Sequence, residues 1–114
     1  MATTYKVLAP ATPTTSRTSI AAASGDYVVP SATATVVSTI SITNTTSGAL
    51  SAYAYVVKSG GTSGTANAIV YGSSVAANSI TTITIGITLA TGDALVFGSS
   101  ATGLTIQAFG SEIA

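Results

Sequence analysis

The sequence predicts an all-β protein: a single antiparallel β-sandwich, immunoglobulin-like or jelly-roll-like, with eight or nine short strands. Ala, Thr, Ser and Gly account for 68 of the 114 residues, whereas strong helix formers such as Glu, Lys, Gln and Arg are scarce. Thr, Val and Ile are β-branched and fit a pleated sheet better than a helix. Short segments in which apolar and polar residues alternate are separated by turn residues throughout the chain.

The N-terminal part combines short strands with connections that contain proline. Residues 5–9 are expected to form a strand, and the stretch from Pro10 to Pro13 an extended connector. Residues 17–22 and 26–29 are expected to form two further short strands, the second of which ends at Pro30.

Residues 34–44 show the clearest alternation with a period of two, which is typical of a half-buried strand. One predicted face carries Val36, Ser38, Ile40 and Ile42, and the opposite face carries Thr35, Val37, Thr39, Ser41 and Thr43. A turn at residues 45–48 leads into a second strand over residues 49–58. A flexible, glycine-rich loop follows at residues 59–65.

The second half of the chain repeats this pattern of short strands and turns. Residues 79–89 form the second long strand, in which Ile83, Ile85, Ile87 and Leu89 are expected to share one face. Gly86, on the other face, indicates a bulge or a close neighbour. Shorter strands are expected over residues 67–72, 94–97 and 104–109, separated by turns at residues 90–93 and 99–103.

The length of 114 residues fits one domain. We therefore expect residues 1–114 to form a single β-sandwich. Residues 1–15 are a candidate extended N-terminal arm, and residues 110–114 a C-terminal tail.

Charged residues make up only 5% of the chain, against about 25% in ordinary globular domains. The formal net charge is zero, since three cations are balanced by three anions: Lys6, Arg17, Lys58, Asp26, Asp93 and Glu112. A freely diffusing domain normally carries a charged surface that prevents association, and charged residues that block its sheet edges. The shortage of charge therefore predicts a protein whose surface contacts other subunits, with self-association as a homo-oligomer.

Several classes of function are disfavoured by the same composition. Three scattered cations cannot supply the basic surface that nucleic-acid binding requires, and no apolar stretch is long enough to cross a membrane as a helix. Histidine and cysteine are absent, which removes the usual nucleophile–base pairs and transition-metal ligands. Asp26 and Asp93 fall near turns, where aspartate commonly accepts backbone hydrogen bonds. We therefore expect no enzymatic activity, no cofactor and no metal.

The large apolar and aromatic side chains are the best candidates for an interface. Tyr53 and Tyr55 share one face of a predicted strand and Tyr71 follows nearby, so the three could pack, fill an interface or stack on sugar rings. Apolar residues near both termini are the other candidates: Tyr5, Val7, Leu8, Phe109 and Ile113.

Three segments also resemble a known family. The opening MATTYKVL, the sequence DYVVP followed by ATVVSTISITN, and the ending ITLATGDALVF…LTIQAFGSEIA are similar to small phage structural proteins that are frequent in cyanophages and other aquatic tailed phages. The resemblance covers both ends and the central strand but not residues 51–79. Its most specific segments are TLATGDALVF and the C-terminal FGSEIA.

The resemblance implies a non-enzymatic virion structural protein, located in the phage particle and assembled in the host cytoplasm. Its first expectation is a capsid decoration (cement) protein that binds the major capsid protein or other virion proteins and stabilises the outer shell. A tail, neck or baseplate component is the alternative within the same class. A glycan-binding adhesin module, using the loop at Gly60 and the tyrosines, is an alternative from a different class.

Overall fold

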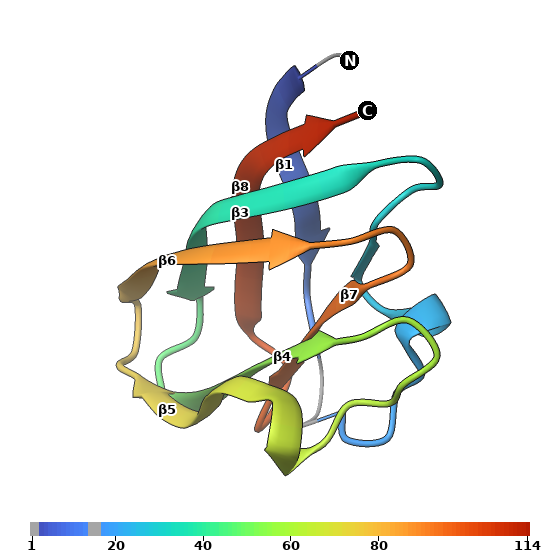
Figure 1. Cartoon of the computed structure of the whole chain (residues 1–114). Coiled ribbons are helices and arrows are strands. Elements are labelled where there is room, and N and C mark those ends of the chain that lie inside the picture. Colours follow the sequence, from blue (N-terminus) through green and yellow to red (C-terminus); the bar gives the residue numbers. More distant parts are fainter. Residues whose placement is uncertain (1–2, 14–16) are drawn as a thin grey trace.

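A computed structural model describes residues 3–13 and 17–114 of the chain, and over these residues it is built almost entirely of β-strands (Figure 1). Two short 3-10 helices, Ala22–Ser24 and Thr65–Asn67, lie in the connections. The strands within the described residues are β1 (Thr3–Ala11), β2 (Tyr27–Val28), β3 (Ala34–Asn44), β4 (Leu50–Val57), β5 (Ala68–Val75), β6 (Ile80–Leu89), β7 (Ala94–Ser99) and β8 (Leu104–Ile113).

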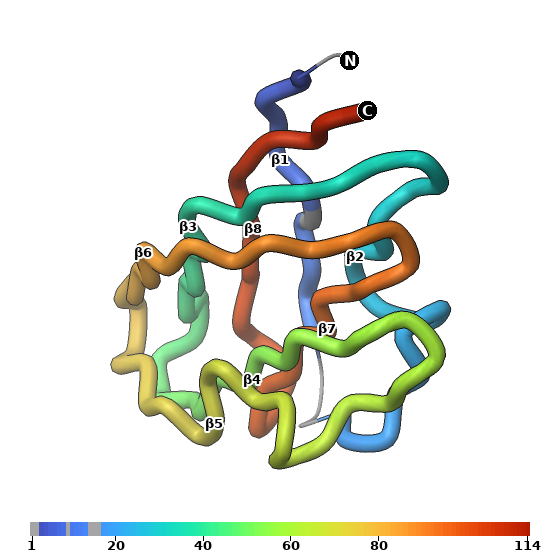
Figure 2. The backbone as a smooth tube through the Cα atoms, viewed as in Figure 1, coloured from blue at the N-terminus to red at the C-terminus, as the bar shows by residue number. Residues whose placement is uncertain are grey.

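The strands form two four-stranded antiparallel sheets, which we call sheet A (order β1-β8-β3-β6) and sheet B (order β2-β7-β4-β5). Only the connection from β4 to β5 joins neighbours within one sheet, and every other connection crosses from one sheet to the other (Figure 2). This double-sheet arrangement of eight strands is a jelly roll. The expected all-β sandwich is confirmed, and the strand order selects the jelly-roll alternative over the immunoglobulin-like one.

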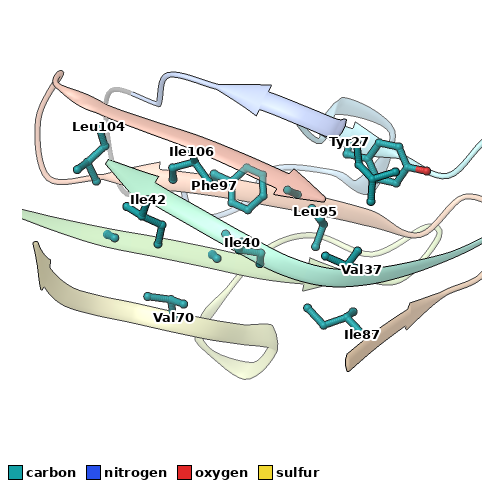
Figure 3. Close-up of a cluster of buried hydrophobic side chains, with 14 of the residues drawn as sticks. Tyr27, Val37, Ile40, Ile42, Val70, Ile87, Leu95, Phe97, Leu104 and Ile106 are labelled. Carbon is teal, nitrogen blue, oxygen red and sulfur yellow. The ribbon is translucent and has the colours of Figure 1, made fainter. Parts of the chain in front are cut away.

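The main core fills the space between the two sheets. Figure 3 shows Ile40, Ile42 and Ile106 from sheet A facing Leu95 and Phe97 from sheet B. All five side chains are almost completely buried. Apart from Phe97 and Tyr27 the core consists of aliphatic side chains, as expected for a chain with few aromatic residues.

Three irregularities lie side by side across sheet A and change which side chains face the core. Leu8 in β1 and Ser38 in β3 are each inserted without a pairing partner in β8. On the other side of β3, two residues of β6, Ile85 and Gly86, lie opposite the single residue Ser38. A bulge of this kind bends a strand and increases its twist, and Figure 1 shows both β3 and β8 bending along their length. The bulge expected at Gly86 is therefore confirmed.

The bulge at Ser38 corrects the predicted faces of β3. Thr35 and Val37 lie on the inner face together with Ile40 and Ile42, whereas Val36 and Ser38 point outward. The strict alternation expected from the sequence fails because one inserted residue moves all residues before it to the opposite face. Ile85 lies in the bulge of β6 opposite Ser38 and is 37% exposed, whereas Ile87 and Leu89 are buried and Ile83 packs against the core, on the face that the four residues were expected to share.

Sheet B is also covered on its outer face, which makes its central strand β7 buried on both sides. A second apolar cluster forms there from Tyr55, Val57, Val96, Ala94 and Ala22. Ala22 belongs to the segment between β1 and β2, which crosses the sheet and bonds to the loop after β4 through backbone contacts. Residues 17–22 were expected to form a strand, but they form turns and an isolated bridge from Ala21 to Thr62 because this segment covers the sheet instead of joining it.

The chain ends are part of sheet A. Residues 3–11 pair with β8 from Thr3 opposite Ile113 to Ala11 opposite Ile106, and residues 110–113 continue β8. Residues 3–11 of the candidate arm and residues 110–113 of the candidate tail therefore lie in paired strands, and the strand expected over residues 5–9 is present within β1. Residues 1, 2, 14 and 15 of the expected arm lie outside the described residues.

Within residues 3–13 and 17–114 no helix has the length and apolar character needed to cross a bilayer.

Candidate functional site

A groove of about 510 Å³ opens on the outer face of sheet A. It lies over β1, β8 and β3, beside the aligned bulges. Its lining is Tyr5, Lys6, Val7, Val36, Ser38, Phe109, Gly110 and Ser111. Most of this surface is apolar, and Lys6 is its only charged residue.

The groove owes its shape to the close approach of β8 and β3 at Gly110. A Cβ atom at this position would lie 2.0 Å from the carbonyl oxygen of Val36, so only glycine allows the two backbones this separation. The Ser38 hydroxyl donates a hydrogen bond to the carbonyl of Phe109 at 3.1 Å, which holds the bulged residue against β8. Small residues thus lie between the larger side chains of Tyr5, Val7 and Phe109.

Two groove residues present apolar surface to solvent. The side chain of Tyr5 is 83% exposed and that of Val7 is 48% exposed. The neighbouring Leu8 is buried, because the bulge turns it into the core. Aromatic side chains are enriched in protein interfaces, and an exposed apolar cluster beside a groove is typical of a contact surface.

The single cation of the groove is neutralised from within the fold. The amino nitrogen of Lys6 lies 3.0 Å from Oε1 of Glu112. The other carboxylate oxygen of Glu112 accepts a hydrogen bond from the Tyr27 hydroxyl, which in turn contacts the Thr35 hydroxyl at 2.8 Å. We call these four residues the corner network, because they join β1, β8, β2 and β3 where the two sheets meet.

The corner network shifts the protonation of two of its members. The hydrogen bonds from Tyr27 and then Lys6 lower the pKa of the Glu112 carboxyl below its usual value. Burial, and next the hydrogen bond to Glu112, raise the pKa of Tyr27 to about 12. Both shifts favour the same state, with an ionised Glu112 and a neutral Tyr27, over the neutral pH range.

The remaining charges are also engaged in structural contacts, apart from Lys58. Arg17 contacts both carboxylate oxygens of Asp26 at 2.6 and 2.7 Å, and the pair bonds to the backbone N–H and carbonyl of Phe97. Asp93 accepts hydrogen bonds from the backbone N–H groups of Ala90 and Ser59. Asp93 thus bonds to the backbone of its turn, as expected, whereas the backbone partner of Asp26 lies in the distant strand β7 and its ion pair with Arg17 was not expected. Lys58 is exposed and forms no ion pair with the described residues.

The structure divides the eight residues expected at an interface into four groups. Tyr5, Val7 and Phe109 come together in the groove. Leu8 and Tyr55 are buried, with Tyr55 completely enclosed in the cluster outside sheet B, and these two are therefore removed from the candidate interface. Ile113 is half-buried at the end of β8 and does not line the groove.

Tyr53 and Tyr71 form a separate patch on the outer face of sheet B, on the opposite side of the sandwich. Their rings meet edge to face, with centroids 5.1 Å apart and an interplanar angle of 85°. Tyr71 is 57% exposed, whereas Tyr53 is half-buried against the second cluster. The tyrosines near residues 53–71 and the apolar residues near the termini thus form two surfaces.

Sequence reasoning missed the groove residues Val36, Ser38 and Gly110. The strict alternation assigned the first two to a buried face, and no local signal marks the bulge at Ser38. The sequence of β8 does place a glycine between two residues of an alternating strand, which is a signal for a close backbone approach.

Within the described residues no group of His, Cys, Asp or Glu side chains is arranged to hold a metal ion. Comparison of the chain with protein-family models, with curated proteins and with solved structures gives no match. The fold and the groove therefore define the chain as a jelly-roll domain with an apolar groove and exposed apolar side chains beside it.

Proposed function

We propose that the chain is a non-enzymatic structural subunit of a phage particle, and specifically a capsid decoration protein that binds the outer shell. The observation that carries this proposal is the apolar groove with the exposed Tyr5 and Val7. The chain has only six charged side chains, and five of them already form contacts within the fold. Such a surface is suited to lasting contact with another protein, because apolar burial stabilises the contact and few charges need to be desolvated.

Two further points support the proposal. The jelly roll is an architecture of viral capsid domains, although it also serves lectins and other proteins, so the fold alone does not assign a function. The segments that resemble phage structural proteins include those that build the groove: MATTYKVL supplies Tyr5 and Val7 from β1, and the ending FGSEIA supplies Phe109 and Gly110 from β8.

Binding to particles can be tested with two matched tyrosine variants. We expect Tyr5→Asp to lose particle association, because it places an unpaired charge in the groove. Tyr71→Asp on the opposite face is the control and is expected to bind like the unmodified chain. Both side chains are largely exposed, so circular dichroism should show an intact fold for each. The measurement is co-sedimentation of the purified chain with particles that lack it, and equal binding of the unmodified chain and Tyr5→Asp would contradict the proposal.

Copy number in purified particles separates the capsid from the tail. Hundreds of copies per particle are expected for a decoration protein, whereas a ring in the tail, neck or baseplate would contain a small number set by its rotational symmetry. Quantitative mass spectrometry of purified particles measures this directly. Complete absence of the chain from particles would overturn the proposal.

The exposed ring of Tyr71 favours a second candidate, a glycan-binding adhesin, since sugars stack on exposed aromatic rings. A glycan array tests it, with Tyr71→Ala as the variant expected to lose any signal and Tyr5→Ala as the control. Glycan binding that depends on Tyr71, together with absence from particles, would replace the decoration role by the adhesin role.

A further inference from the structure

Each sheet of the sandwich ends in two edge strands, and the four edges differ in how they are protected. β1 carries Lys6, Pro10 and the bulge at Leu8. β2 is two residues long, and the Arg17–Asp26 pair bonds to the neighbouring strand just beyond it. β5 is interrupted by two bulges, one of them at Gly72 with a φ of 70°. Charges, proline, bulges and short length are the usual means of preventing edge-to-edge association.

β6 lacks most of these protections over its first half. Residues 80–84 pair with β3 in regular register, without a bulge, and no other strand of residues 3–13 and 17–114 pairs with the opposite edge of β6. The segment from Ser59 to Gly92, which contains both β5 and β6, carries no charged residue. Ile80 is 60% exposed, and Thr82 and Thr84 are exposed on the same face. An apolar, uncharged edge of this kind has free backbone donors and acceptors that a further strand can satisfy.

We propose that residues 80–84 of β6 pair antiparallel with the same residues of a second copy of the chain, about a twofold axis at Thr82. This inference deepens the proposed role as an assembly subunit and rests on it, since it names a second copy as the partner of this edge. The dimer joins two copies of sheet A into one continuous sheet of eight strands. The groove lies over the other strands of sheet A and stays free in this dimer.

The choice of a second copy follows from the symmetry of the segment. In an antiparallel pair centred on Thr82, Ile80 lies opposite Thr84 of the other copy, and Thr81 lies opposite Ile83. The backbone N–H and C=O groups that point away from β3 belong to every second residue of β6. The twofold axis at Thr82 relates residue 80 to 84 and residue 81 to 83, so these groups lie opposite the equivalent groups of the second copy. Each opposed pair combines Thr with Ile or with Thr, which are favourable cross-strand neighbours, and no like charges meet.

The chain contains no cysteine, so a single introduced thiol can report this register. Opposed residues in antiparallel strands have Cα atoms about 4.5–5.5 Å apart, a range that a disulfide can bridge. Under mild oxidation Thr82→Cys is expected to form covalent dimers about tenfold faster than Thr88→Cys, because pairing raises the effective thiol concentration at the axis alone. Thr88 is the matched control, since it is an exposed threonine on the same strand beyond the bulge.

Sedimentation of the purified chain over a concentration series gives an independent readout. The mass of the unmodified chain is expected to rise from 11.0 kDa towards twice that value. Thr82→Lys is expected to remain a monomer, because the two lysines would face each other at the axis, whereas Thr88→Lys should dimerise normally. A chain that stays monomeric throughout, a Thr82→Lys variant that dimerises normally, or equal cross-linking of the two cysteine variants would each overturn the inference.

These measurements use the purified chain alone, so they are separable from the particle assay. Dimerisation at Thr82 in a chain that is absent from particles would contradict the proposed function and leave the edge pairing supported. A monomeric chain that binds particles through Tyr5 would contradict the edge pairing alone.

Discussion

At the scale of single residues, a few polar side chains at the ends of the sandwich fix contacts that the apolar core cannot specify. Asn44 is buried, and its amide donates to the carbonyls of Gly48 and Val75 and accepts from the backbone N–H of Thr46. The corner network of Lys6, Glu112, Tyr27 and Thr35 has the same role at the other end. Buried polar groups whose hydrogen bonds are all satisfied favour one packing arrangement over alternatives.

The corner network predicts a loss of stability in alkali. The pKa of Tyr27 is raised from 10.0 to about 12 in the folded chain, so its contribution is fully present below pH 10 and is lost as the pH rises towards 12. Tyr27→Phe should lower the free energy of unfolding by about 1–2 kcal/mol at neutral pH, through loss of the hydroxyl contacts with Glu112 and Thr35. Urea unfolding at pH 8 and pH 11.5 measures both effects. The variant should lose less stability than the unmodified chain between these pH values, and an equal loss in both would contradict the assignment.

Glu112 makes the opposite contribution in acid, since its pKa is lowered in the folded chain. Its stabilising effect is present above the unfolded value of 4.5 and is lost as the pH falls through the lower folded value. The corner network therefore contributes fully to the free energy of unfolding between mildly acidic and mildly alkaline pH, where Glu112 is ionised and Tyr27 is neutral.

At the scale of the elements, glycines in sheet A have different roles although all lie in strands. Gly110 allows the backbones of β8 and β3 to approach each other beside the groove, whereas Gly86 lies in a bulge of the edge strand with open space around it. Neither glycine has a positive φ, so the available space decides what each position tolerates.

This contrast predicts very different effects of alanine at the two glycines. Gly110→Ala should destabilise the fold by about 3 kcal/mol, because the new methyl group would meet the Val36 carbonyl and a backbone atom cannot move aside cheaply. Gly86→Ala should change the stability by no more than about 0.5 kcal/mol. Thermal or denaturant unfolding of the two variants provides the comparison. Similar stability of both would show that β8 and β3 are further apart than described.

At the scale of the whole molecule, five of the six charged side chains form ion pairs or hydrogen bonds within the chain. Two of the three cations form ion pairs with Glu112 and Asp26, and Asp93 bonds to two backbone N–H groups. The surface is therefore dominated by hydroxyl, amide and aliphatic groups. The proposed contacts to other subunits would then depend on apolar burial and hydrogen bonds, since exposed ion pairs contribute only about 0–1 kcal/mol each.

We therefore expect attachment to particles to resist salt. Raising the salt to about 1 M shortens the Debye length to about 3 Å and weakens exposed ionic contacts, but it does not weaken apolar burial. The chain should remain bound across a salt series and be released by denaturant or mild detergent, as followed by gel analysis of the particles after each wash. Complete release by salt alone would show that a strongly charged partner surface dominates the attachment.

The sequence by itself determined the fold class and most strand positions. β-Branched residues, alternation and turn residues are local signals, and they located the strands near residues 34–44, 49–58, 79–89 and 104–109. They also indicated the bulge at Gly86 and the backbone contacts of Asp26 and Asp93. The strand positions and the bond from the Ala90 N–H to Asp93 depend on neighbouring residues, which is why they can be read without the fold. The backbone partner of Asp26, Phe97, lies 71 residues away and could not be read in this way.

Only the tertiary structure decided which faces are buried and which candidate residues share a surface. The bulge at Ser38 turned Val36 outward into the groove, and the segment around Ala22 covered Tyr55 on what would otherwise be an open sheet face. The pairing that runs from Thr3 opposite Ile113 to Ala11 opposite Ile106 showed which sheet the N-terminal strand joins. In each case the deciding partner lies far away in the sequence, so no local pattern could reveal whether a strand face meets solvent, a crossing segment or another strand.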